Sequence, residues 1–385
     1  MFLKRSTGKV VLVADIDDMS VGVSIVRLIP GEPAVVISKK RETLPLEERT
    51  KEHSAAAISQ LLEKNAGDVL KSYAGTAAKA APKPPVAVYA ILHAPWTRFR
   101  TAETEELYDT PRVVRKDAIA TLAKKALEAT SDFDRGNILE TGVMHVYLNG
   151  YATGTPIGKR AVCAGVIAFE SEAQPDIKKS ITDVLSRILP GRTPIIRSST
   201  SALLAVLGEH MPDIQRFLVI DVGSSVTSCA AVLKEAQTRT EVVQEGLTTI
   251  LARVAGAGLP EETLTQLRML ASDTCSTDAC KALKDSLARA EPDLAKVFGE
   301  AFAKLAAERR LPNAAMLSAP AEFSPWLQGF FSRIDFSQFT ATLQPFTVEP
   351  LTAEHLRDVV TWQEGLPDTA LGVAAGYVNI LEQDS

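Results

Sequence analysis

The 385-residue sequence has little cysteine and no long run of basic residues, and each shortage excludes a class of protein. Four cysteines are too few for a secreted scaffold held together by disulfide bonds. Lys and Arg total 42 against 47 Asp and Glu, which gives a formal net charge of −5. A nucleic-acid-binding protein that contacts phosphates through a basic stripe is therefore excluded.

Long hydrophobic runs are also missing. The longest uncharged stretch, Thr141 to Gly158, is rich in glycine and threonine and contains Asn149 and Pro156. This composition is typical of strands and turns and excludes a membrane-spanning helix. Near the N-terminus, the apolar run Val10 to Ala14 ends at Asp15, so it is shorter than the roughly 7–15 residues of a secretory signal. We therefore expect a cytoplasmic protein.

The sequence does contain enough apolar material for a packed core. Hydrophobic residues make up 46% and charged residues 23%, which is the balance of a globular protein. At 385 residues the chain exceeds one ordinary domain and predicts roughly two or three. Composition alone indicates no chemistry.

The N-terminal region is predicted to combine strands with one helix. Buried apolar runs and short turn-like breaks predict an antiparallel meander of three strands at 10–16, 21–29 and 34–38. Apolar residues at near-helical spacing predict a helix at 54–73, and another buried run predicts a strand at 86–92. The intervening segment 75–85, rich in Pro, Lys and Ala, is predicted to be a loop.

The rest of the chain continues the same mixture. In the middle region the apolar spacing predicts helices at 116–130 and 177–189 and strands at 138–148 and 161–169. The C-terminal region is predicted to contain a strand at 314–317 and helices at 259–270, 279–290, 294–309, 323–332 and 369–381. Pro345 and Pro350 restrict the segment 341–351 to the edge of a sheet.

Two segments far apart in the sequence resemble each other. Near the N-terminus the chain reads VLVADIDDMSVGVSIV, and later it reads FLVIDVGSSVTSCAAV. Each is an apolar strand that ends in an aspartate, followed by a turn and a second apolar strand. Because helices follow both copies, the repeat indicates a duplicated α/β fold.

The second copy carries residues that suit phosphate binding. Gly223 permits a sharp turn after Asp221, and consecutive N–H groups and hydroxyls in such a turn can bind phosphate oxygens. A carboxylate at the strand end can hold Mg²⁺. The same pattern occurs in ordinary hairpins, so this segment alone leaves both interpretations open.

The pair of hairpins resembles the phosphate-1 and phosphate-2 loops of the actin-like ATPase superfamily, and the chain is most similar to its bacterial FtsA and PilM branch. That branch has an SHS2-type subdomain between the hairpins, and residues 137–169 are similar to it, notably Asn149-Gly150 and Pro156 to Lys159. The segments SSTSALLAVL (198–207) and TALGVAAGYV (369–378) are similar to the helix before phosphate-2 and to the closing helix of the family. The resemblance covers nearly the whole chain, although each motif is loose.

This resemblance implies an α/β fold of two duplicated actin-like (RNase H-like) domains with an inserted SHS2-type α+β subdomain. It implies a first actin-like subdomain at 8–95, the inserted subdomain at 96–192, and a second actin-like half with the closing helix at 193–385. It also implies ATP with Mg²⁺ as the cofactor, with Asp15 and Asp221 as the Mg²⁺ ligands if ATP binds. The nucleotide-binding residues that the resemblance carries to this chain are Asp15, Asp18, Ser20, Asp221, Gly223, Ser224, Ser225, Thr227 and Ser318.

The first loop departs from the family pattern. Asp17 replaces the family's glycine, and Asp18 and Met19 replace small residues. A carboxylate about 4 Å from a phosphate charge costs on the order of 4 kcal/mol at an effective dielectric constant of 20.

The other two loops are altered as well. Ser224 and Ser225 replace glycines, and Ser228 replaces an acid. The expected Gly-Gly turn of the adenosine loop is Ser318-Ala-Pro-Ala-Glu322, in which Pro320 lacks an N–H donor. We therefore hypothesise that the protein keeps the fold and binds nucleotide weakly or not at all, and we assign no catalytic residue.

The C-terminal end differs from that of FtsA, which closes in a basic amphipathic helix on the bilayer. Here Arg357 is the last basic residue, and the acids that follow it are Asp358, Glu364, Asp368, Glu382 and Asp384. Such a segment is repelled by an anionic membrane, so we expect no direct membrane insertion. PilM-like proteins, which lack this helix and bind the cytoplasmic end of a membrane partner, fit better.

The leading hypothesis is a non-catalytic scaffold of the FtsA/PilM type, which acts through protein contacts in bacterial cell division or type IV pilus assembly. Its expected partner is the cytoplasmic segment of a membrane protein at the inner face of the membrane, with the inserted subdomain as the contact or self-assembly surface. The alternative is an active ATPase or small-molecule kinase of the same superfamily. A third interpretation is a duplicated α/β protein whose likeness to actin is incidental.

Other candidate residues point to no specific chemistry. Cys275 and Cys280 have no histidine or second cysteine pair nearby, which disfavours a metal site. The histidines lack any catalytic or metal-binding spacing and are interpreted as structural or surface residues; they are His53, His93, His145, His210 and His355.

Overall fold

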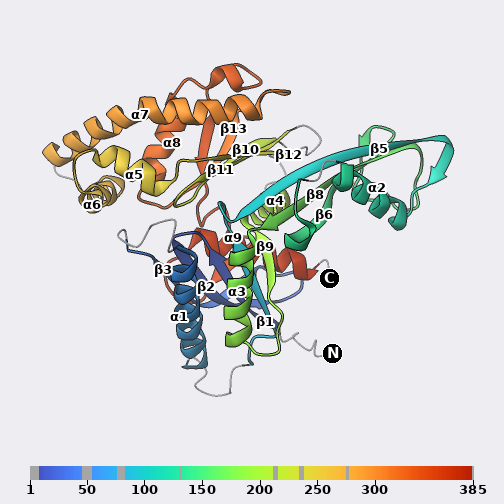
Figure 1. Cartoon of the computed structure of the whole chain (residues 1–385), viewed down its shortest axis with the longest axis horizontal. Coiled ribbons are helices and arrows are strands. Elements are labelled where there is room, and N and C mark those ends of the chain that lie inside the picture. The colour runs from blue at the N-terminus through green and yellow to red at the C-terminus, as the bar shows by residue number, and fades with distance from the viewer. Residues whose placement is uncertain are drawn as a thin grey trace.

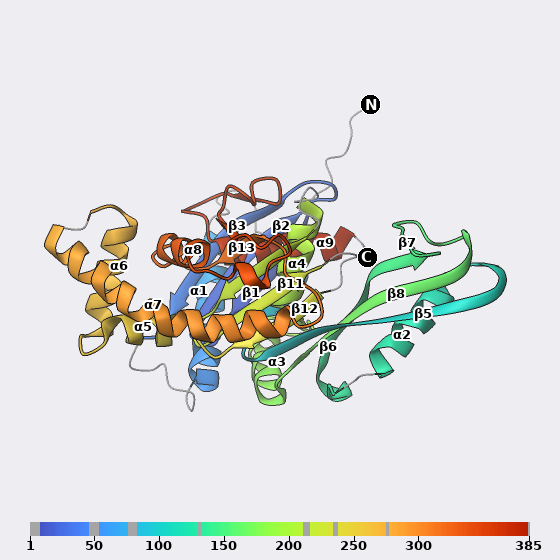
Figure 2. The same ribbon diagram turned by 90° about the horizontal axis from the view of Figure 1, so that it is seen from above.

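The computed structural model describes residues 8–45, 54–75, 83–129, 132–210, 216–233, 238–274 and 277–383. Of the features predicted above, His53, Cys275, Asp384 and most of the 75–85 loop lie outside these ranges. The described chain forms three β-sheets (Figure 1). In two perpendicular views the sheet made by residues 97–173 extends to one side of the other two (Figures 1 and 2).

The first sheet is built around the N-terminal hairpin. Strands β1, β2 and β3 pair antiparallel in sequence, which confirms the predicted meander, and β4 lies parallel to β1. Two strands from far along the chain complete the edges, because β9 pairs with β4 and β15 with β3. In spatial order the strands are β15 (Val360–Trp362), β3 (Ala34–Thr43), β2 (Ser20–Leu28), β1 (Lys9–Ile16), β4 (Ala87–Leu92) and β9 (Ile195–Ser198).

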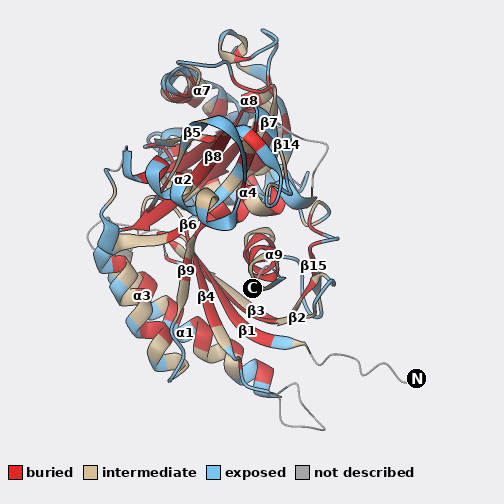
Figure 3. Ribbon diagram, turned by 90° about the vertical axis from the view of Figure 1, so that its right-hand side faces the viewer, coloured by how far each residue is buried: buried red, intermediate tan, exposed pale blue. Residues whose placement is uncertain are grey.

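Helices cover both faces of this sheet, which is why β1 reads as an unbroken apolar run. Leu12 and Ile16 belong to the core under α1 and α3, whereas Val11 and Val13 belong to the core under α4 and α9. Figure 3 shows the strands mostly buried and exposed residues on the outer sides of α1 and α3. The four helices are α1 (Ser54–Gly75), α3 (Pro175–Ile188), α4 (Ser199–His210) and α9 (Thr369–Gln383).

The second sheet repeats the topology of the first. Strand β10 pairs antiparallel with β11 and parallel with β13, as β1 does with β2 and β4, which confirms the predicted duplication. Strand β14 lies at the edge, as its flanking prolines predict. The strands in spatial order are β12 (Thr238–Val243), β11 (Thr227–Val232), β10 (Phe217–Val222), β13 (Ala314–Ser318) and β14 (Thr347–Pro350).

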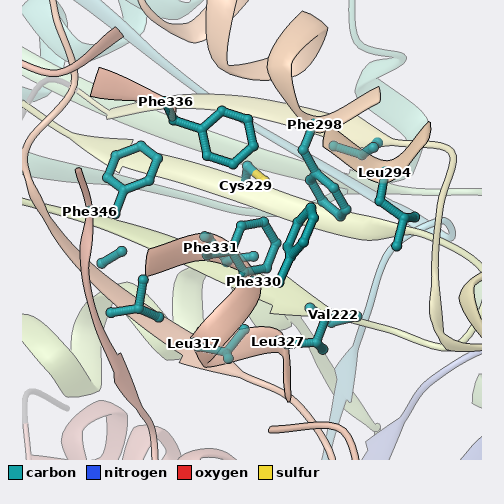
Figure 4. Packing of buried hydrophobic residues seen from close by; sticks show 14 of the residues in the cluster. Val222, Cys229, Leu294, Phe298, Leu317, Leu327, Phe330, Phe331, Phe336 and Phe346 are labelled. Carbon is teal, nitrogen blue, oxygen red and sulfur yellow. The ribbon is translucent and has the colours of Figure 1, made fainter. Parts of the chain in front are cut away.

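Aromatic side chains fill the core on one face of the second sheet. Phe298 from α7 meets Phe331 from α8 edge to face, with ring centroids 4.9 Å apart. Both rings lie in one cluster with Cys229 of β11 (Figure 4). The helices of this half are α5 (Leu247–Ala255), α6 (Pro260–Ala271), α7 (Thr277–Leu305) and α8 (Ser324–Arg333).

Helix α7 corrects one expectation, because the helices predicted at 279–290 and 294–309 form a single helix with Pro292 inside it. Leu287 before the proline and Leu294 and Phe298 after it are all buried in the same core. This packing on both sides of Pro292 outweighs the loss of one backbone hydrogen bond. The short helix α5 was not predicted from the sequence.

The third sheet lies between β4 and α3 in the sequence. The predicted turn between β6 and β7 is confirmed, since Asn149 and Gly150 both have positive φ angles, of 54° and 82°. Helix α2 (Lys116–Ala129) covers one face of this sheet. The spatial order of the strands is β5 (Thr97–Val113), β8 (Arg160–Ala173), β6 (Ile138–Leu148) and β7 (Tyr151–Ala152), and β5 was not predicted as one long strand.

A buried carboxylate ties the third sheet to the rest of the protein. Glu140 of β6 accepts hydrogen bonds from the hydroxyls of Ser171 and Tyr377 at 2.8 Å each and from the Ser198 N–H at 3.1 Å. Its Oε2 also lies 3.3 Å from Nε of Arg197. These bonds join β6 and β8 to β9 and to the closing helix α9.

The acidic end of α9 contacts the first sheet. Glu382 forms an ion pair with Lys9 at 2.6 Å and accepts a hydrogen bond from the Tyr89 hydroxyl. Among the residues that the structure describes, no helix combines the length and the apolarity needed to cross a bilayer.

Candidate functional site

The turns of the two duplicated hairpins face each other. In the first turn the Asp17 N–H donates to the Ser20 carbonyl at 3.0 Å, and in the second the Gly223 N–H donates to the Val226 carbonyl at 3.0 Å. The Ser224 hydroxyl donates to the Asp17 carboxylate at 2.6 Å. The residue that replaces the first-loop glycine is therefore hydrogen-bonded to the second loop.

Helix α5 begins directly beneath the second hairpin. A Cβ on Gly246 would lie 2.4 Å from the backbone of Ser225, so only glycine allows this approach. The first N–H groups of α5, from Leu247 and Thr248, donate to hairpin carbonyls at 2.9 Å each. These donors are thus satisfied within the protein and are not available to an anion.

His93 lies between the aspartates that end β1 and β10. Its Nε2 is 2.8 Å from Oδ1 of Asp15, and its Nδ1 is 3.4 Å from Oδ2 of Asp221. Both carboxylates are buried. His93 follows β4 directly, and its backbone N–H donates to the Ile16 carbonyl at 3.0 Å, which fixes the backbone of His93 beside the first hairpin.

Arg41 binds the other oxygen of Asp15 because of the strand register. Asp15 is opposite Gly22 on β2, and Gly22 is opposite Arg41 on β3. A Cβ on Gly22 would lie 2.6 Å from Nη2 of Arg41, so the missing side chain lets the guanidinium cross β2. Nη2 of Arg41 then donates to Asp15 at 2.6 Å.

The same guanidinium reaches the closing helix. Nε of Arg41 donates to Oδ2 of Asp368 at 2.7 Å, and Oδ1 of Asp368 accepts the Leu371 N–H at 3.0 Å in an N-cap of α9. A row of alternating charges therefore runs from the second sheet to α9, and we call it the charge row; its members are Asp221, His93, Asp15, Arg41 and Asp368.

The electrostatics of the charge row favour the ionised forms. Burial alone lowers the pKa of His93, but the charge of Asp15 and the hydrogen bonds to Asp15 and Asp221 outweigh it and raise this pKa well above its usual value. Burial alone raises the pKa of Asp15, but His93 and Arg41 hold it well below its usual range. His93 is therefore a cation between two carboxylates at neutral pH.

Asp18 behaves in the opposite way. Burial, followed by the negative charge of Asp17, raises the pKa of Asp18 to about 8. Its Oδ1 is buried and has no hydrogen-bond partner among the described residues. Asp18 is therefore largely protonated at neutral pH, and the first loop carries one carboxylate charge fewer than the sequence indicates.

The structure gathers most of the residues predicted for nucleotide binding. Asp15 and Asp221 belong to the charge row, and Gly223, Ser224, Ser225 and Asp18 form the facing turns. The Ser20 hydroxyl accepts a hydrogen bond from Arg41 at 3.2 Å, and Ser318 lies beside Asp221 in the β10–β13 ladder. Thr227 differs, because its hydroxyl donates to the Glu245 carbonyl at 2.7 Å and is therefore not part of the two facing turns.

Sequence reasoning missed three members of the charge row: His93, Arg41 and Asp368. For His93 a usable signal existed, since it follows a buried strand directly and parallel strands end at the same edge of a sheet. Arg41 and Asp368 gave no signal, because their contacts depend on the register across Gly22 and on the return of α9 to the first sheet.

The residues present do not fit Mg²⁺·ATP. The two carboxylates expected to hold the metal are bound by His93 and Arg41, and the Asp17 carboxylate binds a second-loop hydroxyl that a phosphate would need. Entry of phosphates between the hairpins requires these contacts to break.

The sequence matches no protein-family model and no curated protein. The structure is similar to a solved PilM–PilN type IV pilus biogenesis complex, with a TM-score of 0.61 and 13% identity over 98% of this chain and 99% of that chain. A weaker similarity is to the ethanolamine utilization protein EutJ from Carboxydothermus hydrogenoformans, with a TM-score of 0.47 and 12% identity over 98% of this chain and 92% of that chain. Another is to a hexokinase from Schistosoma mansoni complexed with glucose, with a TM-score of 0.42 and 10% identity over 96% and 86% of the two chains. The chain has the actin-like ATPase fold.

Replacing His93 tests the charge row. His93→Gln keeps a polar side chain but leaves two buried carboxylates without their shared cation, so we expect the free energy of unfolding to fall by about 3 kcal/mol in urea titrations at pH 7. The control is His355→Gln, because His355 is only partly buried and contacts the exposed Glu349 at 2.8 Å, and there we expect a loss below about 1 kcal/mol. Equal losses in the two variants would contradict the charge row.

Asp18 gives the protein a pH dependence of defined sign. Its folded-state pKa of about 8 exceeds the unfolded value of 3.8, so folding stability falls as pH rises between these values. Asp18→Asn removes the titrating carboxyl and with it this loss of folding stability at higher pH. We expect the substitution to stabilise the protein by about 1–4 kcal/mol at pH 7 and very little at pH 4. Asp285→Asn, at an exposed position on α7, controls for the lost charge. A stabilisation independent of pH would refute the assignment.

Proposed function

We propose that this protein is a non-catalytic, actin-like scaffold of the PilM type that acts through protein contacts in type IV pilus assembly or cell division. The observation that carries the proposal is the position of His93 between Asp15 and Asp221. In the family that the hairpins resemble, bound Mg²⁺·ATP lies between the corresponding loops. Here a side-chain cation already links the two strand ends.

The loop contacts support the same conclusion. Each phosphate brought beside Asp17 would meet a carboxylate, at a cost on the order of 4 kcal/mol for a 4 Å separation and an effective dielectric constant of 20. It would also have to displace the hydroxyl of Ser224 from that carboxylate. An ATPase or kinase needs the opposite arrangement, with donors free to bind the phosphates.

The third sheet supplies a surface for partners. Six of the twelve large apolar side chains that are exposed among the described residues lie on this sheet or its connecting loops, and Leu107 and Tyr151 are 76% and 79% accessible. Exposed apolar side chains that gather on one element mark a contact surface. The others in this set are Val113, Val143, Ile157 and Val162.

The solved neighbour comes from a pilus biogenesis complex with PilN, and we propose a comparable arrangement for this chain. Its partner would be the cytoplasmic segment of a membrane protein, bound by the inserted subdomain at 96–192, with self-assembly through the same subdomain as a second use. The actin-like parts would be 8–95 and 193–385. The protein would then lie at the inner face of the membrane through its partner, without inserting into the bilayer.

Nucleotide titration tests the loss of ATP binding. We expect Mg²⁺·ATP to produce no saturable heat at the hairpins in calorimetry, which corresponds to a Kd above about 100 µM. We also expect no rise in Tm, because a ligand that does not bind the folded state cannot stabilise it. Binding tighter than this limit that disappears in Asp221→Ala would favour the enzyme hypothesis.

A paired substitution tests the scaffold role. Leu107→Glu combined with Tyr151→Glu places charges on the third sheet and should reduce co-purification of a membrane protein from native cells by at least about tenfold. The control is Leu259→Glu next to α6, where the side chain is 59% exposed on the second half. If the paired variant and the control retain the same membrane protein equally, the third sheet is not the contact surface.

A further inference from the structure

Three arginines line one cavity at the far end of the second sheet, away from the charge row. Arg216 precedes β10, and Arg309 and Arg310 follow α7. The cavity has a volume of about 280 Å³. Leu233 and Pro312, both buried, supply its apolar lining. The charge row lies at the opposite ends of β10 and β13, so the two features are separate.

Arg310 is held in a fixed position. The Leu311 N–H donates to the Phe339 carbonyl, and the Ala341 N–H donates to the Leu311 carbonyl, both at 2.8 Å. This pairing places Arg310 beside the 338–340 segment, where its Nη1 donates to the carbonyls of Gln338 and Thr340. Only one nitrogen of the guanidinium is used in this way, so its remaining N–H groups can bind a ligand.

The other two guanidinium groups have no partner among the described residues. The side chains of Arg216 and Arg309 form no ion pair and no hydrogen bond with any described residue. Glu308, the acid next to Arg309, is already paired with Arg239. Arg309 also borders a second cavity with Glu103 and Glu105, but neither carboxylate forms an ion pair with it, so three exposed guanidinium groups gather here without an ion-pair partner among the described residues.

Structural roles do not account for this arrangement. Cations stabilise the C-terminal end of a helix only within its last turn, whereas Arg309 and Arg310 lie four and five residues beyond Leu305, where α7 ends. Arg216 comes from a different element altogether. Like charges around one small cavity repel one another unless an anion lies between them.

We propose that this cavity, bounded by Arg216, Arg309 and Arg310, is a binding site for a phosphate group. Guanidinium forks match the oxygens of phosphate in pairs, and phosphate supplies the charge needed to balance several of them. The volume admits a phosphate or pyrophosphate group and excludes the bulk of a nucleotide. The phosphate could belong to a soluble compound or to a lipid headgroup, and both have the same chemistry.

Pyrophosphate is the probe for the first experiment. In calorimetry and thermal unfolding at constant ionic strength, with chloride as the control anion, we expect pyrophosphate to bind and to raise the Tm. Arg216→Gln combined with Arg309→Gln should weaken binding by at least about tenfold, because each substitution removes charge-assisted hydrogen bonds. Arg216→Lys should retain part of the affinity. Arg192→Gln, at an exposed position between α3 and β9, is the matched control and should bind like the wild type.

Vesicles distinguish the two sources of phosphate. Binding to phosphatidylglycerol vesicles that the paired variant abolishes, and that pyrophosphate displaces, assigns a lipid headgroup to the site. Pyrophosphate binding without vesicle binding assigns a soluble phosphate compound. The proposal is overturned if neither pyrophosphate nor the vesicles bind, or if the paired variant leaves pyrophosphate binding unchanged. It is also overturned if an acidic peptide binds at the cavity and pyrophosphate cannot displace it. If ATP produces binding heat in calorimetry and the paired variant removes that heat, the ATP binds at this cavity and not at the hairpins. The cavity and the proposed function are therefore tested separately.

Discussion

The imidazolium of His93 is the ionic contact that joins the two halves. It brings together the ends of β1 and β10, one from each duplicated sheet, and each end is a buried carboxylate. Isolated buried charges are costly, and their mutual attraction compensates only when the geometry satisfies all of them. The alternation of sign along the charge row meets this condition, because each interior member has an opposite charge on both sides. Moving one half relative to the other would separate His93 from Asp221 and leave the Asp221 carboxylate without its cation, whereas His93 would keep Asp15.

The facing turns follow from the same constraint. Once the strand ends are fixed, Asp17 and Asp18 are brought against the second hairpin, where two adjacent carboxylates would repel each other. The structure resolves this conflict in two ways: Ser224 donates to Asp17, and Asp18 retains its proton. The Asp17 carboxylate of the first loop therefore becomes a contact between the halves. Asp17 in the first loop and Ser224 in the second are thus complementary.

Much of the fold could be predicted from the sequence, because it depends on local patterns. Apolar runs identified β1, β4 and β10 as strands, and the repeated strand–aspartate–strand pattern identified the duplication. The failures have tertiary causes. Pro292 suggested a helix boundary that does not exist, because core packing on both sides of it keeps α7 continuous. Strand β5 is largely exposed and polar, so its strand conformation comes from pairing with β8 and not from an apolar pattern in its sequence. The aspartates of the site were found from the repeat, whereas the cations that bind them come from elements outside it.

The duplication also explains why the two aspartates are bound differently. Asp15 lies opposite Gly22, and the next strand places Arg41 there, so a guanidinium can cross the glycine to reach the carboxylate. In the second half, Ser228 of β11 lies opposite Asp221, and Val242 of β12 lies opposite Ser228. No glycine therefore leaves a gap across β11, and Val242 carries no charge that could reach Asp221. Among the described residues, His93 is consequently the cation of Asp221, whereas Asp15 has two. The asymmetry makes the ionic link between the halves depend on one side chain from the first half, and it identifies the Asp221 side as the weaker end of the charge row.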